Sequence, residues 1–248
     1  MRKKVLVILG VLLLIISISL FVTAKIISDK NELQYKKTYQ AYTLLYKDVD
    51  KKIPVDGITL KSVEKVEKSV DLVVYKEKKK SLMTNLQELN KYIKLRDDIN
   101  NYYENNIVKS SITIEMVNEL LERNNKLIKT HQELLLPRIN TIKEQIDNIN
   151  TYKTSIALLF TDNTYQTVRS DITRENLNQV LALKNNILQQ DVINEQDNYL
   201  NIVAKELAYR EEQERIRQEE ERKRKEEEAR KERERQIKEA WTVLNVPY

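Results

Sequence analysis

The stretch "ITRENLNQV" at residues 172–180 resembles "ITIEMVNEL" at 112–120 and "ITLKSVEKV" at 58–66. Each stretch begins with Ile and Thr, and an apolar residue stands five positions after the Ile. A Thr before a helix caps it by accepting a hydrogen bond from a free backbone N–H. An apolar pair at this spacing forms a hydrophobic staple. The repeated phrase therefore predicts three helix starts, and chance similarity in a chain rich in Ile, Thr and Asn is the alternative.

The predicted N-caps are Thr59, Thr113 and Thr173, and we expect a long helix to follow each of them. Glu115 and Glu175 lie in the first turns, where the helix dipole favours an acidic side chain. The first copy has no acid there, because its corresponding position is Lys61. The Thr cap is therefore the feature that predicts a helix start in all three copies.

The composition predicts an all-α protein. The 248 residues include only two Gly and three Pro, and 33% are charged. Domains with many strands need more turn residues, whereas long solvated helices have this charge content. The absence of Cys excludes disulfides and thiolate chemistry. A single histidine, His131, predicts no zinc site or catalytic triad, and we expect it to pack partly exposed. We predict no catalytic, cofactor or metal site.

The net charge of +5 does not indicate nucleic-acid binding, because no long Lys/Arg stripe alternates with aromatic residues. The N-terminal sequence is more informative. Three basic residues precede Val5–Ala24, which contains no charge and would span about 30 Å as a helix. We predict a membrane anchor at residues 1–27, with residues 5–24 in the bilayer. The alternative is a signal peptide cleaved after Val22-Thr23-Ala24, although its apolar core is usually shorter.

The positive-inside rule predicts that the basic N-terminus stays in the cytoplasm and that the rest of the chain lies outside the cell. The reverse orientation is the alternative. After the anchor, Tyr35, Tyr39, Tyr42 and Tyr46 share one helix stripe because they are four, three and four residues apart. Exposed tyrosines can stack on sugars or peptides. These four residues are therefore candidate binding residues for cell wall or a protein partner, and packing against neighbouring helices is the alternative.

Residues 28–204 are predicted to form an elongated antiparallel helical bundle with coiled-coil character. A second helix is expected at residues 60–105, after the turn "KKIPVDG". The third helix has an unbroken heptad series, which continues past Pro137. We therefore expect one kinked helix there, although Pro removes a backbone hydrogen bond. The series consists of Leu121, Ile128, Leu135, Ile142, Ile149 and Ile156.

Residues 205–240 are predicted to form a charged single α-helix. Residues 211–239 contain 12 acidic and 11 basic side chains, with opposite charges repeatedly four positions apart. Such pairs stabilise an isolated helix, and the missing apolar seam makes a coiled-coil partner unnecessary. Disorder is the alternative. The pairs are Glu211/Arg215, Glu219/Lys223, Glu220/Arg224, Glu221/Lys225, Glu226/Arg230 and Glu227/Lys231.

The last residues, "AWTVLNVPY" at 240–248, are interpreted as a β-strand. Their "LNVPY" resembles the first strand of papain-like cysteine peptidase domains of the bacteriocin-processing type, which occur on Gram-positive surface proteins. The resemblance implies that residues 241–248 begin a missing domain, and no catalytic residue can be assigned in a chain without Cys. A hydrophobic tail is the alternative.

We therefore expect a single-pass, membrane-anchored extracellular stalk that presents a C-terminal domain or partner. The alternatives are a helical module that binds cell wall or protein, and a surface cysteine peptidase that lacks its catalytic domain here. The sequence makes no prediction about the oligomeric state.

Overall fold

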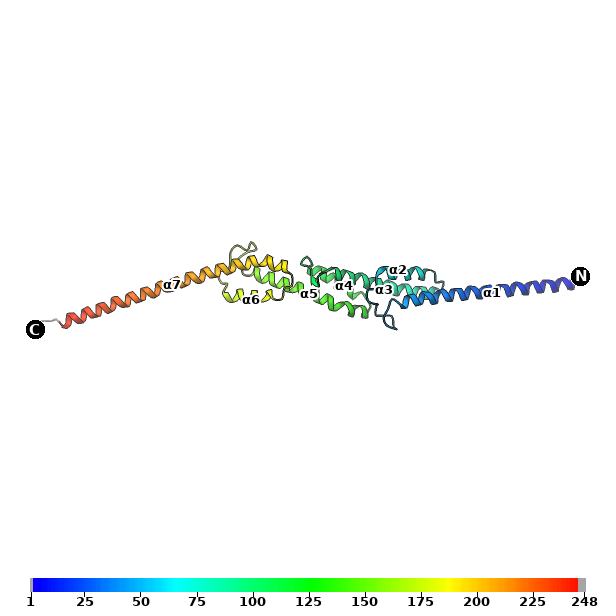
Figure 1. Ribbon diagram of the computed structural model, residues 1–248, viewed down its shortest axis with the longest axis horizontal. Helices are drawn as coiled ribbons and strands as arrows, with labels where there is room; N and C mark the ends of the chain where they lie inside the picture. The colour runs from blue at the N-terminus through cyan, green and yellow to red at the C-terminus, as the bar shows by residue number, and fades with distance from the viewer. Residues whose placement is uncertain (1, 245–248) are drawn as a thin grey trace. The chain divides into compact units, whose positions relative to one another are not determined.

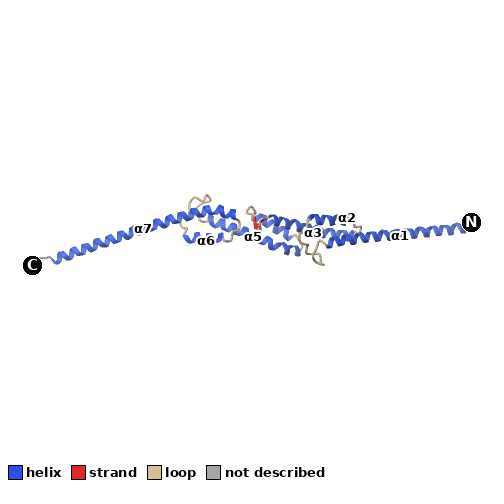
Figure 2. Ribbon diagram, in the orientation of Figure 1, coloured by secondary structure: helices blue, strands red, loops and turns tan. Residues whose placement is uncertain are grey.

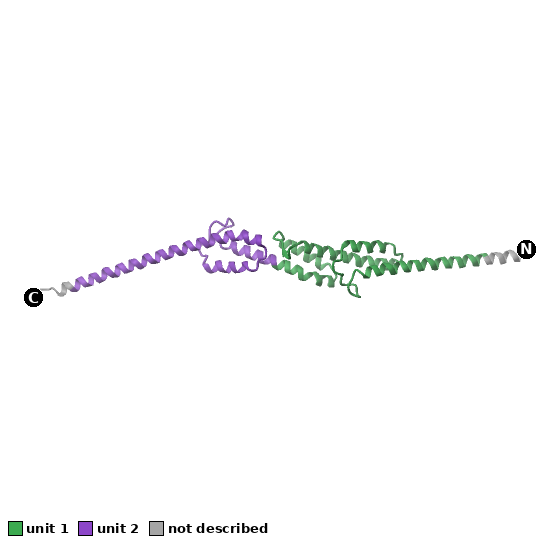
Figure 3. Ribbon diagram, viewed as in Figure 1, with its two compact units in different colours: residues 1–144 green, residues 145–248 purple. Residues whose placement is uncertain are grey.

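The computed structural model describes the backbone of residues 2–244 and the side chains of residues 12–240. Within this range the protein is all-α, with seven helices and one very short β-hairpin (Figures 1 and 2). The chain divides into two compact units, unit 1 at residues 1–144 and unit 2 at residues 145–248 (Figure 3). The division falls inside the range 28–204, for which the sequence predicts one bundle.

The three predicted N-caps are confirmed. Thr59, Thr113 and Thr173 immediately precede helices α2 (Leu60–Asp71), α4 (Ile114–Asn125) and α6 (Arg174–Lys184). In each case the Thr hydroxyl accepts a hydrogen bond from the backbone N–H three residues later. Thr173 also forms a reciprocal capping box, because the Asn176 side chain accepts from the Thr173 backbone N–H.

The predicted length of these capped helices was wrong. They contain only 12, 12 and 11 residues. A turn separates each from a longer helix, namely α3 (Lys76–Asn101), α5 (Lys129–Ala157) and α7 (Gln190–Leu244). One apolar side chain is buried in each turn, at the same sequence distance from its Thr cap: Val73, Leu127 and Ile187. Burial of this side chain takes the place of the Gly or Pro that usually marks a helix end.

The connection that precedes each cap is also repeated. The end of a long helix pairs with the returning chain through a backbone hydrogen bond, first from Val55 to Leu45 at 3.0 Å. The same bond joins Lys109 to Tyr102 and Arg169 to Leu159. In the middle copy the connection contains the hairpin of β1 (Tyr103–Glu104) and β2 (Ile107–Val108). The shared phrase therefore belongs to a threefold structural repeat and is not a chance similarity.

The core of each copy uses equivalent positions of the long helices. Pro137 lies inside the continuous helix α5, which confirms that it does not divide the helix. The heptad series, however, crosses a break, because Ile128 is in the turn before α5 and is exposed. The equivalent buried positions are Leu82, Leu135 and Gln196; Leu86, Ile139 and Leu200; Leu89, Ile142 and Val203; and Ile93, Ile146 and Leu207.

Two long helices begin and end the described chain. Helix α1 (Arg2–Thr43) continues without interruption from the apolar segment to the part that packs against α2. Helix α7 includes the charged segment, so the helix predicted for residues 205–240 is confirmed. The strand predicted for residues 240–248 is wrong as far as Leu244, where the backbone is still helical. Extending an existing helix adds one hydrogen bond per ordered residue, whereas a strand needs a partner. Residues 245–248 lie outside the described residues.

Candidate functional sites: the apolar helix and the tyrosine groove

The first part of α1 exposes a continuous apolar surface. Side chains such as Leu14, Leu20 and Phe21 are 62%, 67% and 72% exposed, and no described part of the chain covers them. By its length and composition, this helix is long and apolar enough to cross a membrane. The hydroxyls of Ser17 and Thr23 donate to carbonyls four residues back at 2.8 Å. Such bonds satisfy polar groups without water.

A second candidate site is the tyrosine groove, which we define by Tyr35, Tyr39 and Tyr42 of α1, Tyr46 of the connection after it, and the residues facing them. The single helix stripe predicted for all four is wrong for Tyr46, because α1 ends at Thr43. The groove encloses about 590 Å³, and α1, the connection after α1, α3 and the start of α5 form its walls. Asn85 and Glu88 contribute polar groups from α3. The structure therefore brings all four predicted residues together in one groove of unit 1.

Two of these tyrosines belong to the core. Tyr42 and Tyr46 are only 3% and 8% exposed, and their ring centroids lie 5.3 Å apart. In the repeat, the position of Tyr42 corresponds to Ile99 and Ile156, which are fully buried. Packing therefore accounts for Tyr42 and Tyr46 without any ligand. Burial raises the pKa of both hydroxyls above the ordinary value for tyrosine, most strongly for Tyr46.

The other two tyrosines already have cationic neighbours from this chain. The Lys78 ammonium lies 4.0 Å from the centroid of the half-buried Tyr35 ring, and Lys51 lies 5.1 Å from that of Tyr39. These distances allow cation–π attraction. Tyr39, which is 37% exposed, is the most accessible ring of the four. A stacking ligand would have to displace Lys51 from it.

His131 also lines the groove, and the prediction that it is partly exposed was wrong. The side chain is 1% exposed and packs against Tyr92, with ring centroids 4.7 Å apart. Neither ring nitrogen has a well-aligned hydrogen-bond partner. Burial lowers the pKa of His131, and the nearby Glu88 opposes this only in part, so the imidazole is neutral at pH 7. The sequence contains no signal for this burial, because it depends on how α5 packs against α3.

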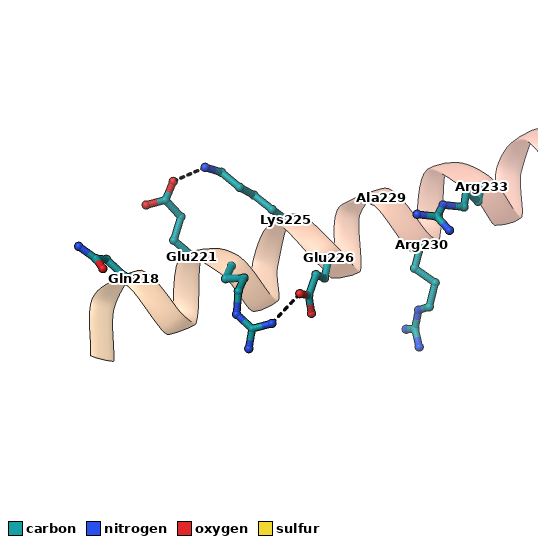
Figure 4. A pocket seen from close by; sticks show the side chains of 8 residues that line it. Gln218, Glu221, Lys225, Glu226, Ala229, Arg230 and Arg233 are labelled. Carbon is teal, nitrogen blue, oxygen red and sulfur yellow. Dashed lines mark hydrogen bonds and ion pairs between the residues drawn. The ribbon is translucent and has the colours of Figure 1, made fainter. Parts of the chain in front are cut away.

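The hollow drawn in Figure 4 is not a comparable site. All its walls are side chains of α7, among them Glu221 and Lys225, whose ion pair measures 2.7 Å. Because one helix cannot enclose a ligand, the hollow lacks the concave shape of a binding pocket. Among residues with described side chains, no cluster of three or more His, Asp or Glu is arranged to hold a metal ion.

The chain matches no protein-family model, and no curated protein or solved structure is significantly similar to it. The resemblance of "LNVPY" to a peptidase strand stays a prediction, since most of this segment lies outside the described residues.

Proposed function

We propose that this protein is a membrane-anchored helical spacer, in which α1 crosses the bilayer and the following helices hold a C-terminal domain or partner away from it. The observation that supports the anchor best is the uncovered apolar surface of Leu12–Ile27. Removing one large aliphatic side chain from water is worth about 1.5–3 kcal/mol. A run of such side chains is therefore far more stable in lipid than in water.

The charged part of α7 supports the spacer. Every side chain from residue 221 to 240 is exposed, so no described element packs on this stretch. Ion pairs three or four residues apart follow one another along it, including Lys231 with Glu227 at 2.8 Å. Three predicted pairs occur, whereas Arg215, Arg224 and Arg230 pair with Glu212, Glu228 and Glu234 instead. Residues 211–240 would extend about 45 Å as a straight helix.

Arg2, Lys3 and Lys4 before the span support the outward orientation. The lysines after the span favour the reverse orientation by the same rule: Lys25, Lys30, Lys36 and Lys37. A topology experiment is therefore part of the test.

The natural chain has no Cys, so a single reporter thiol is easy to introduce. Val49, which is 91% exposed, is a suitable position for Val49→Cys. A membrane-impermeant maleimide should label this variant in intact cells, and alkaline carbonate should leave the full chain in the membrane pellet. Labelling only after lysis would show that the protein has the opposite orientation. Release by carbonate, or a mature N-terminus after Ala24, would contradict the anchor.

The two alternative functions remain testable. The helical binding module has its best support in the accessible Tyr39 ring. The cysteine peptidase requires a Cys and a later His in genomic sequence that continues "LNVPY". Neither alternative explains the uncovered charged helix as directly as the spacer does.

A further inference from the structure

The turn between α2 and α3 exposes apolar side chains next to the candidate membrane span. Leu72 and Val74 are 66% and 57% exposed, while Val73 between them is buried. Single exposed aliphatic residues are common on proteins. Here, however, two of them lie at the tip of one turn, and that turn lies beside α1.

The contacts of this turn place it beside the part of α1 that follows the apolar run. The Lys78 ammonium lies 3.6 Å from the Glu32 carboxylate, and the rings of Tyr75 and Tyr35 meet edge to face at 6.3 Å. Helix α2 runs back along α1, since Thr38 lies beside Ser69. The tip therefore points toward the apolar end of α1.

The turn lies just beyond the apolar part of α1. Ile27 is the last exposed aliphatic residue of the apolar run, and Tyr35, which contacts Tyr75, is eight residues further along α1. Eight residues of helix rise about 12 Å. The polar layer on each side of a bilayer is about 5–8 Å thick. Because the tip of the turn points back toward the apolar run, the side chains of Leu72 and Val74 reach the outer part of the headgroup layer when α1 spans the membrane.

Positive charge is concentrated at the same end of unit 1. Residues 68–80 contain five Lys against Asp71 and Glu77, a net charge of +3. Residues 25–37 contain four Lys against Asp29 and Glu32, a net charge of +2. The connection at residues 44–58, at the other end of α1, contains three Lys and three Asp and is neutral. Clusters of lysine next to a membrane span favour anionic lipid.

We propose that the turn at residues 72–80 is a second membrane contact, in which Leu72 and Val74 enter the headgroup layer and Lys76 and Lys80 bind anionic lipid. Both lysines are exposed, whereas Lys79 already pairs with Asp71 at 3.2 Å. This inference rests on the proposed membrane anchor. A single spanning helix is free to rotate about its axis, and a second contact beside it fixes which face of unit 1 lies against the lipid.

The test uses the full chain in vesicles of phosphatidylcholine and phosphatidylglycerol, with one nitroxide label per variant. Leu13→Cys reports on the span, Val74→Cys on the turn, and Val49→Cys is the matched control at the other end of α1. Relaxation by oxygen and by a water-soluble nickel complex measures the depth of each label. We expect Leu13 to be lipid-exposed and Val49 to be in water. Val74 should show severalfold lower nickel accessibility than Val49, together with raised oxygen accessibility.

The second part of the test asks whether the depth of the Val74 label depends on charge. Lys76→Gln with Lys80→Gln, or vesicles of pure phosphatidylcholine, should move the Val74 label toward water and leave Leu13 unchanged. A Val74 label that resembles Val49, while Leu13 is in lipid, overturns the second contact and leaves the anchor intact. Low accessibility of Val74 to both reagents indicates a protein contact and also overturns it. A Leu13 label in water overturns the anchor together with the inference.

Discussion

Two roles are suggested for Tyr42. Its neighbours in the sequence suggest a binding role, and its position in the structural repeat suggests a core role. In the sequence it belongs to a series of four tyrosines at helical spacing, which suggests a binding surface. In the repeat it occupies a core position that is Ile in the other two copies. The hydroxyl is accommodated by hydrogen bonds with Tyr46 and Asn85. The packing role therefore takes precedence, and Tyr39 is the better residue for a binding test.

Tyr42→Ala should cost about 3–5 kcal/mol of unfolding free energy, as for other large aromatic residues removed from a core. Tyr39→Ala should cost much less, because Tyr39 is 37% exposed. Chemical denaturation of the full chain in detergent, followed by circular dichroism, measures both. If Tyr39→Ala keeps the fold but loses binding to isolated cell wall, the binding-module alternative gains direct support. Equal losses of stability in the two variants would contradict the assigned burial.

His131 should make unit 1 sensitive to mild acid. Burial lowers the pKa of the folded imidazole below its ordinary value of about 6.5. The unfolded chain therefore binds the proton more readily, and stability falls as the pH drops below about 6.5 toward the folded pKa. His131→Leu should remove this slope, and it should change stability at pH 7 only slightly, because it replaces a buried group whose ring nitrogens have no well-aligned hydrogen-bond partner. An unchanged pH slope in thermal melts of His131→Leu would show that other groups cause it.

At the scale of the element, the short helices α2, α4 and α6 depend on both of their ends. The Thr cap determines where each helix starts, and the buried residue in the following turn determines where it stops. Between these points each helix has only three turns or so, too few to be stable alone in water. Packing on the long helices therefore stabilises them, and the caps contribute a local part of the free energy.

Thr173→Ala and Thr113→Ala should each cost about 1 kcal/mol, within about 0.5–2 kcal/mol. The larger loss should occur at Thr173, because it is part of a reciprocal capping box. Thr→Ser at the same positions is the control, since it retains the hydroxyl. Melts in which Ala and Ser variants behave alike would show that the hydroxyls do not stabilise the helices.

Arg210 on α7 makes hydrogen bonds with the connection between α5 and α6, which is the last connection of the repeat. Its guanidinium donates to the backbone carbonyls of Val168 at 3.1 Å and Arg169 at 3.0 Å, and to the Glu206 carboxylate at 2.8 Å. Arg210→Met keeps most of the side-chain volume and removes these donors. Hydrogen exchange at the Arg169 amide, which donates to Leu159, should become faster in this variant. Exchange at the Lys109 amide of unit 1 is the internal control and should not change.

At the scale of the whole molecule, the spacer function depends on whether the exposed part of α7 stays helical without a partner. Its ion pairs lie on the surface, and salt screens such interactions. Spin labels at Tyr209→Cys and Ala240→Cys should be separated by about 46 Å in a narrow distribution. Two Pro residues inserted near Ala229 should shorten the mean distance between the labels and broaden its distribution. A broad distribution in the unmodified chain would make this segment a flexible tether.

The spacer prediction also distinguishes a single helix from a coiled coil. A peptide of residues 206–240 should be helical at low salt, with the same circular dichroism at every concentration. Helicity that rises with peptide concentration would mean self-association, which the missing apolar seam argues against.

The sequence by itself determined the features that are decided within one element. The Thr caps, the apolar span and the charged helix depend on neighbours no more than about five positions apart along the chain, or on the character of a single uninterrupted run. The all-α class follows from the same local information, together with the scarcity of Gly and Pro.

Only the tertiary structure decided where the capped helices end, which tyrosines are buried, that His131 lies in the core, and that the turn with Leu72 and Val74 sits beside α1. The heptad series predicted one continuous helix, and this was wrong. Its spacing continues from Leu121 to Ile156 although α4 ends and α5 begins between them. Apolar spacing shows that a helical face is available for burial. Which helix covers that face depends on contacts between residues far apart in sequence, and those contacts form only when the helices pack.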